Sequence, residues 1–187
     1  KASPFAEQHD ILDDVVFDQL RTIILSKRVI HLWIGIVCAS VSQLWLQKGR
    51  PRLRSRQQPD GIVPLPPQWR GYIDRSNLLI KRACELAYLQ WYAGGTYYIE
   101  NPGDVGFMRS PFFKWSKRHA VSLWITSFVR KLAELTQPTW ASTHLCGWGS
   151  PFQKLLTIMA AGPHAWKIYS MNKVRCTHAS HLMLADG

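Results

Sequence analysis

Residues 29–37 have the sequence VIHLWIGIV, a short apolar run rich in β-branched side chains. This composition is typical of a β-strand that is buried on both faces of a sheet. A second run, TYYIE at residues 96–100, has the same character. Between them, residues 73–92 carry apolar side chains at helical spacing, and Gly94 and Gly95 end this predicted helix. A helix that joins two strands in this way predicts that they are parallel neighbours in one sheet.

The rest of the chain continues the alternation of helices and strands. Apolar periodicity predicts helices over residues 13–26 and about 118–134, and runs at 139–145 and 154–160 predict two more strands. The pattern predicts an α/β fold with an open, mostly parallel sheet covered on both faces. We expect one domain over residues 1–187.

The composition excludes a disordered chain and favours a polyanionic partner. Of the 187 residues 47% are hydrophobic and 19% are charged, which is enough for a sizeable core. The formal net charge of +11 favours DNA or another nucleic acid, or an anionic membrane surface. The alternative is a basic protein without such a partner. Four cysteines in a chain of this length do not make a disulfide scaffold, so we expect reduced thiols and an intracellular location.

A loop rich in proline, glycine and arginine separates the first predicted strand from the helix that follows it. It spans residues 47–70, and long loops in compact domains are usually functional or disordered. Its arginines supply positive potential and candidate phosphate contacts, with solvent exposure alone as the alternative. These arginines are Arg50, Arg52, Arg54 and Arg56.

Reactive side chains follow both of the predicted parallel strands. Cys38 comes just after the first strand, and Glu100 and Asn101 come at the end of the second. Ligand sites in open α/β sheets lie beyond the carboxyl ends of the strands. The alternatives are a buried, unreactive cysteine and a glutamate that serves only a turn.

The order of these motifs resembles that of the cytosine-5 DNA methyltransferases and their divergent relatives, over roughly residues 9–187. By this resemblance Cys38 matches the nucleophile, Glu100-Asn101 matches the family's Glu-Asn-Val, and Asp10 with Ile11 matches the contact to the cofactor's adenosine part. The segment CGWGSPFQK, which ends at Lys154, and the later segment CTHASH resemble segments of the divergent relatives. We include Lys154 among the candidate nucleic-acid contacts.

The resemblance implies a Rossmann-like methyltransferase sheet and S-adenosylmethionine as cofactor. A cysteine thiolate adds to C6 of cytosine, and a carboxyl group at the N3 edge stabilises the adduct of the extruded base. Two departures stand out. Val37 replaces the family's proline, and the Gly-rich first cofactor motif would precede Lys1. We therefore expect a domain that is incomplete at its N-terminal edge, with a recognisable site but no methyl transfer by this chain alone.

Two cysteines and two histidines near the C-terminus form a candidate zinc site. Cys176, His178 and His181 have the spacing CxHxxH, and Cys146 would complete a Cys2His2 set of the kind that structural zinc accepts. The alternative is a basic tail with histidines that bind nothing.

Two other functional classes remain open from the sequence. Residues 29–46 contain no charged side chain and approach the ~20 residues of a membrane-spanning helix, although their second half is polar. A non-catalytic nucleic-acid-binding module would need only the positive charge and the loop.

Overall fold

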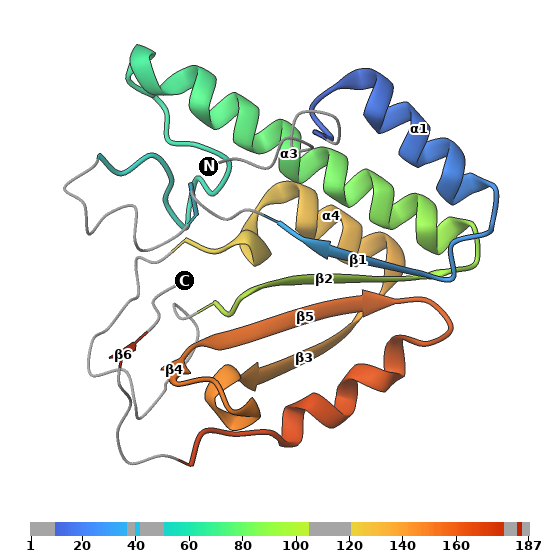
Figure 1. Cartoon of the computed structure of the whole chain (residues 1–187). Coiled ribbons are helices and arrows are strands. Elements are labelled where there is room, and N and C mark those ends of the chain that lie inside the picture. Colours follow the sequence, from blue (N-terminus) through green and yellow to red (C-terminus); the bar gives the residue numbers. More distant parts are fainter. Residues whose placement is uncertain (1–9, 37–39, 42–50, 105–120, 178–182, 185–187) are drawn as a thin grey trace.

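A computed structural model describes residues 10–36, 40–41, 51–104, 121–177 and 183–184 of the chain. The chain is α/β, with one open four-stranded sheet in the order β1-β2-β5-β3 (Figure 1). Its strands are β1 (His31–Gly35), β2 (Thr96–Pro102), β5 (Leu155–Ala161) and β3 (Thr139–His144).

The sheet is mixed rather than mostly parallel in its pairing. β1 and β2 pair in parallel, with His31 opposite Thr96 and Gly35 opposite Glu100, which confirms that prediction. β5 pairs antiparallel with both β2 and β3. Because β5 alone is reversed, β1, β2 and β3 all point the same way. Their carboxyl ends therefore lie at one edge of the sheet.

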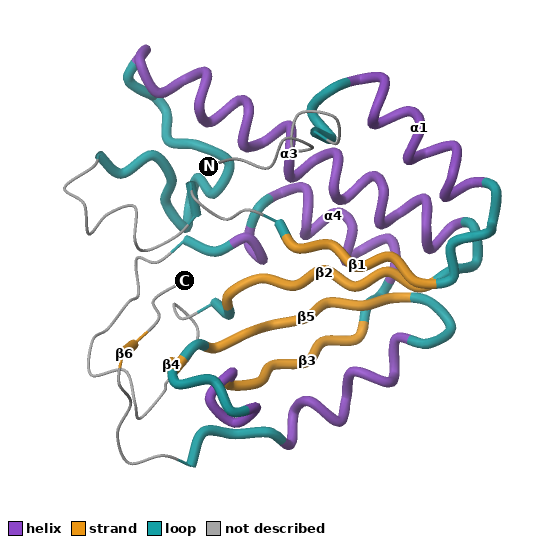
Figure 2. The backbone as a smooth tube through the Cα atoms, in the orientation of Figure 1, coloured by secondary structure: helices purple, strands orange, loops and turns teal. Residues whose placement is uncertain are grey.

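Three helices cover one face of this sheet (Figure 2). They are α1 (Asp14–Leu25), α3 (Pro67–Tyr92) and α4 (Ser127–Thr136). The main core forms between α3, α4 and the strand side chains that point toward them, such as Tyr97, Ile99 and Met159. On the other face Tyr98 and Ile158 pack against the 3-10 helix η4 (Ala165–Lys173).

Two of the predicted helices are present, and the residues at their N-termini explain where each begins. Asp13 caps α1, since its carboxylate accepts hydrogen bonds from the backbone of Val15 and Val16. α3 begins at Pro67, six residues earlier than residues 73–92 predict. Proline suits the first turn of a helix because its missing N–H would have no partner there.

The helix predicted at about 118–134 is wrong at its start. Leu123–Ile125 form a 3-10 turn, η2, and α4 begins only at Ser127. The indole Nε1 of Trp124 donates to the carbonyl of Pro102 at 2.9 Å, and the Asp60 carboxylate accepts from the Ser127 amide at 3.1 Å. These partners, distant in the sequence, set the start of α4. Residues 118–120 lie outside the described part of the chain.

The helical membrane span over residues 29–46 is also wrong, because β1 occupies its first part. Within the described ranges no helix is both long and apolar enough to cross a bilayer. A small second sheet pairs β4 (Phe152–Gln153) with β6 (Met183–Leu184) in parallel, and η3 (Leu145–Trp148) follows β3.

Candidate functional site

A buried asparagine ties the carboxyl end of β2 to that of β1. The Asn101 side chain is 3% exposed, and its Nδ2 donates to the backbone carbonyl of Ile36 at 2.8 Å. Cys38 itself lies outside the described residues, two positions beyond Ile36. Asn101 therefore anchors the chain just before the segment that carries the predicted nucleophile.

Glu100 lies directly opposite Gly35 on the sheet face that points away from α1, α3 and α4. Its side chain alternates with Ile99 and Asn101, which point into the helix layer. Within the described part of the chain, no hydrogen bond or ion pair engages its half-buried carboxylate.

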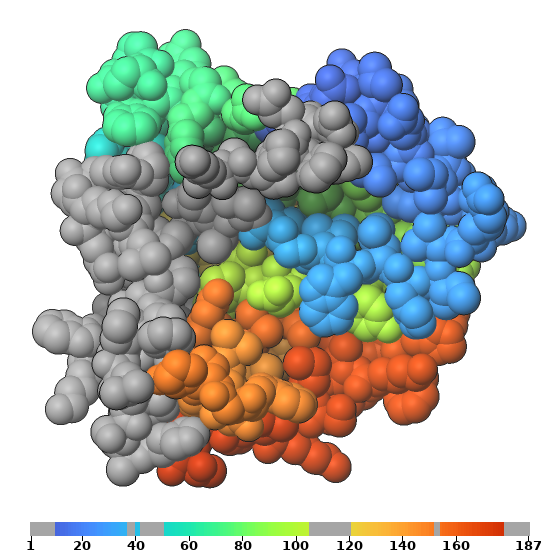
Figure 3. Space-filling view, in the orientation of Figure 1, coloured from blue at the N-terminus to red at the C-terminus, as the bar shows by residue number. Residues whose placement is uncertain are grey.

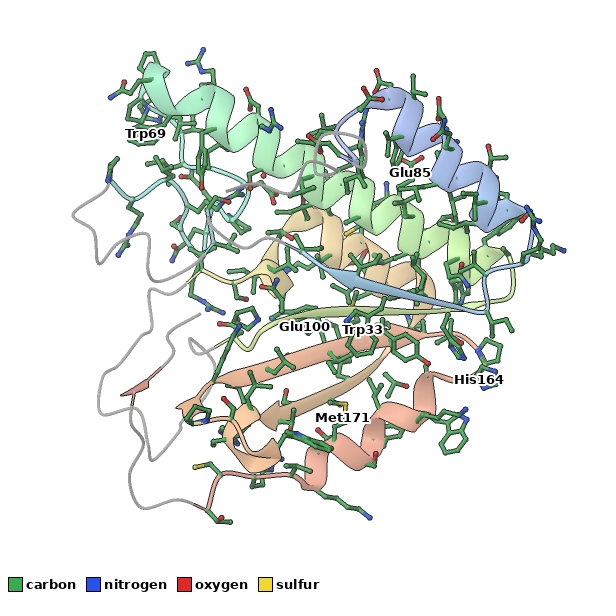
Figure 4. The ribbon with its side chains drawn as sticks, viewed as in Figure 1. Trp33, Trp69, Glu85, Glu100, His164 and Met171 are labelled. Carbon is green, nitrogen blue, oxygen red and sulfur yellow. The ribbon has the colours of Figure 1, made fainter. Side chains whose placement is uncertain are left out.

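Trp33 and Tyr98 form a flat aromatic wall beside Glu100, on the same face of the sheet. Trp33 stacks on Tyr98 with ring centroids 5.2 Å apart and an interplanar angle of 22°. This pair is two register positions before Gly35 and Glu100, so it lies on the same face, and Figure 4 shows Trp33 and Glu100 close together. Residues of β1 form part of the surface in Figure 3. Trp33 is 55% exposed.

Gly35 leaves open space between the wall and the edge of the sheet. A Cβ atom added to it would meet no atom within 4 Å among the described residues. A carboxyl group, a flat aromatic wall and an open position at Gly35 suit a planar ring with polar groups on its edge. The sequence contained a signal for this gap, because a glycine inside a strand often marks the close approach of a ligand.

Arg54 lies inside the protein rather than on a nucleic-acid-binding surface. It is 2% exposed, and its guanidinium donates to Ser40 Oγ at 3.1 Å, to Ser76 Oγ at 3.2 Å and to the Pro59 carbonyl at 2.7 Å. Burial lowers the pKa of Arg54, an effect that the Asp60 carboxylate partly opposes. Ser40 is two residues after Cys38 in the sequence.

The other basic residues predicted to contact nucleic acid lie in different environments. Arg56 makes a bidentate ion pair with Asp104, at 2.8 and 3.0 Å, just beyond β2. Arg52 is exposed, whereas Arg50 lies outside the described residues. Lys154 precedes β5 at the same sheet edge, and its carbonyl accepts from the Leu145 amide.

Asp10 and Ile11 fasten the start of α1 to α3. The two carboxylate oxygens of Asp10 accept from the Leu12 amide at 2.9 Å and from Arg75 at 3.1 Å. The Ile11 carbonyl accepts from Arg82 at 2.8 Å. The contact of Asp10 and Ile11 with the adenosine of S-adenosylmethionine stays a prediction.

The structure brings together two of the four predicted metal ligands. Cys146 and Cys176 are both buried free cysteines, and burial together with the neighbouring Cys176 thiol raises the pKa of Cys146. His178 and His181 lie outside the described residues. Among the side chains that are described, no group of three or more could hold a metal ion.

Comparisons with protein-family models, with curated proteins and with solved structures found no match. The chemistry of the site therefore rests on its own geometry.

Proposed function

We propose that this chain binds nucleic acid and holds a cytosine base against Glu100 for attack by the Cys38 thiolate. One observation carries the proposal. The Asn101–Ile36 hydrogen bond anchors the chain leading to Cys38 beside a carboxylate that has no partner among the described residues. The aromatic pair of Trp33 and Tyr98 offers a stacking surface for an extruded base.

The proposed chemistry is reversible addition to the base. The Glu100 carboxyl group at the N3 edge stabilises the adduct, and the Cys38 sulfur bonds to C6. The C5–C6 π electrons move to C5, which takes a proton from solvent. Loss of the original C5 proton and of the thiolate restores the base. The net result is exchange of the C5 hydrogen with water.

The same proposal covers the fold type. A parallel pair joined through α3, with the candidate residues at its carboxyl ends, supports a Rossmann-like methyltransferase sheet. S-adenosylmethionine would supply the methyl group in such a scaffold. We propose base binding and thiol addition only, without methyl transfer by this chain alone.

The test is exchange of the cytosine C5 hydrogen in D2O, without any methyl donor, on duplex and single-stranded DNA. The wild-type chain should catalyse exchange, and Cys38→Ser should abolish it. Glu100→Gln should slow it by about 100-fold, because the group that stabilises the adduct is weakened. The control Cys84→Ala removes a thiol from the core under α3 and should exchange as the wild type does. Exchange that survives Cys38→Ser contradicts the mechanism.

A second pair of variants tests the place of the base. Gly35→Val fills the gap beside Glu100 with a side chain that strands favour, so it should block exchange while the fold is kept. Thr139→Val, at the start of β3, is the matched control and should leave exchange unchanged. Circular dichroism and thermal melting confirm that both variants are folded.

The second candidate function is non-catalytic nucleic-acid binding, which the net charge of +11 favours. DNA binding without C5 exchange would support this candidate against the chemical one.

A further inference from the structure

A pocket lies between the sheet and the residues of η2 and α4. Its volume is about 370 Å³, which is within the range of sites that bind small molecules. The side chains that line it come from five parts of the chain. They include Asp104 after β2, Trp124 of η2, Arg130 of α4, Trp140 and Ser142 of β3, and Thr157 of β5.

This pocket is on the opposite face of the sheet from Glu100. Trp140 is paired with Met159, which points into the helix layer. Ser142 and Thr157 are paired two positions further along and so point the same way. Glu100 is paired with Ile158, which packs on the other face. The pocket is therefore separate from the candidate base site.

Two indole rings form the apolar walls of the pocket. Trp124 and Trp140 lie edge to face, with ring centroids 5.2 Å apart and an interplanar angle of 78°. The hydrogen bond from Trp124 Nε1 to the Pro102 carbonyl fixes the orientation of the first ring. Trp140 is 40% exposed. An aromatic ligand would therefore meet apolar ring surface that is largely in place before it binds.

The charged side chains of the pocket favour an anion over a cation. Two tryptophans beside a carboxylate would suit a quaternary ammonium group, but Arg56 already neutralises Asp104 through a bidentate ion pair. The guanidinium of Arg130 has no hydrogen bond or ion pair with any described residue. A guanidinium binds a carboxylate or a phosphate through two parallel hydrogen bonds.

A pair of hydroxyl groups adds a polar contact between the two strands. Ser142 Oγ and Thr157 Oγ1 are 2.9 Å apart, and either can be the donor. Their hydrogen bond uses one of the two hydroxyl protons, so the other proton and the remaining lone pairs can meet a polar atom of a ligand.

We propose that this pocket binds a small aromatic molecule that carries an anionic group, either a carboxylate or a phosphate. The ring packs against Trp124 and Trp140, and the anionic group pairs with Arg130. The hydroxyls of Ser142 and Thr157 contact a polar atom of the ligand. This proposal does not depend on the cytosine chemistry, because it uses other residues on the other face of the sheet.

Isothermal titration calorimetry with matched compounds tests the class of ligand. Indole-3-acetate should bind at least about 10-fold more tightly than its neutral amide, because the amide loses the charge-assisted contact with Arg130. Cationic tryptamine should bind more weakly still. Adenosine monophosphate against adenosine makes the same comparison for a phosphate, and the tighter of the two anions identifies the preferred group. The proposal is overturned if neither anion binds, or if the neutral or cationic compounds bind as tightly.

Variants of the wild-type chain then locate the binding site. Arg130→Gln should weaken binding of the anion by about 10-fold and leave the weaker binding of its neutral analogue unchanged. Trp140→Ala should weaken both. The matched control is Lys131→Gln, which removes the same charge from the next, exposed residue of α4 outside the pocket and should bind as the wild type does. Thermal melting checks that the variants are folded. Equal effects of Arg130→Gln and Lys131→Gln overturn the proposal, because binding would then follow net charge alone.

Discussion

Arg54 is the residue whose surroundings differ most from those expected of a loop arginine. Its charge is buried, and its hydrogen-bond partners are two hydroxyls and one carbonyl rather than a carboxylate. A buried guanidinium needs such partners to offset the loss of water. Arg54 therefore fastens the loop to α3 through Ser76 and to the turn at Ser40.

Arg54→Met should keep the volume of the side chain and remove all three hydrogen bonds. Hydrogen bonds to a charged group contribute about 1.5–3 kcal/mol each, although relaxation recovers part of this. We expect the free energy of unfolding in urea to fall by about 2–4 kcal/mol. Arg52→Met, two residues away and exposed, should change it by less than about 0.5 kcal/mol. Equal effects of the two substitutions would contradict a structural role for Arg54.

Single residues also show what could and could not be predicted from the sequence. Glu100 and Asn101 were identifiable because they follow a buried strand, where ligand sites of open sheets gather. The spacing of the arginines could not show that Arg54 turns inward, since its partners at Ser40, Pro59 and Ser76 lie in other parts of the chain. The contact of Asp10 with Arg75 likewise depends on α3, which comes much later in the sequence.

At the scale of elements, β1 is an edge strand of the described sheet that is fixed at both ends by amide side chains. Buried Gln90, near the end of α3, donates to the carbonyl of Val29 at 2.7 Å, just before β1. Asn101 donates to the carbonyl of Ile36, just after it. Between these two points, backbone pairing with β2 holds the strand.

Asn101→Ala should release only the carboxyl end of β1. The free energy of unfolding should fall by about 1–3 kcal/mol, because the Ile36 carbonyl loses its partner in a buried place. Amide hydrogen exchange should rise in residues 32–36 while β5 and β3 keep their protection. Gln137→Ala, which removes an exposed side chain at the end of α4, is the control. A uniform rise over the whole sheet would show that Asn101 acts on global stability and not on this strand end.

The elements themselves were largely predictable, and their arrangement was less so. Apolar runs located the four strands of the main sheet because burial and β-branched side chains act locally. The direction of β5 did not follow from its composition, since a buried strand looks alike in either orientation. The start of α4 also escaped prediction, because the Asp60 carboxylate that meets its first amide lies 67 residues earlier.

At the scale of the whole molecule, the net charge of +11 predicts nucleic-acid binding that weakens with salt and shows little sequence preference. In the structure, not every arginine predicted to contact phosphate is in a position to do so. Arg54 is buried and Arg56 pairs with Asp104, so neither is an exposed phosphate contact. Of the arginines at positions 52, 54 and 56, Arg52 is the exposed one.

Titration of labelled duplex and single-stranded DNA at several salt concentrations tests this distribution of charge. The logarithm of the binding constant should fall linearly with the logarithm of the salt concentration, as counterions are released. Arg52→Ala should reduce the magnitude of that slope by about one at most, uniformly across sequences. Arg56→Gln should change the slope little, because this arginine is already neutralised by Asp104. Binding that is absent at low salt, or unaffected by salt, would rule out an electrostatic nucleic-acid partner for this chain.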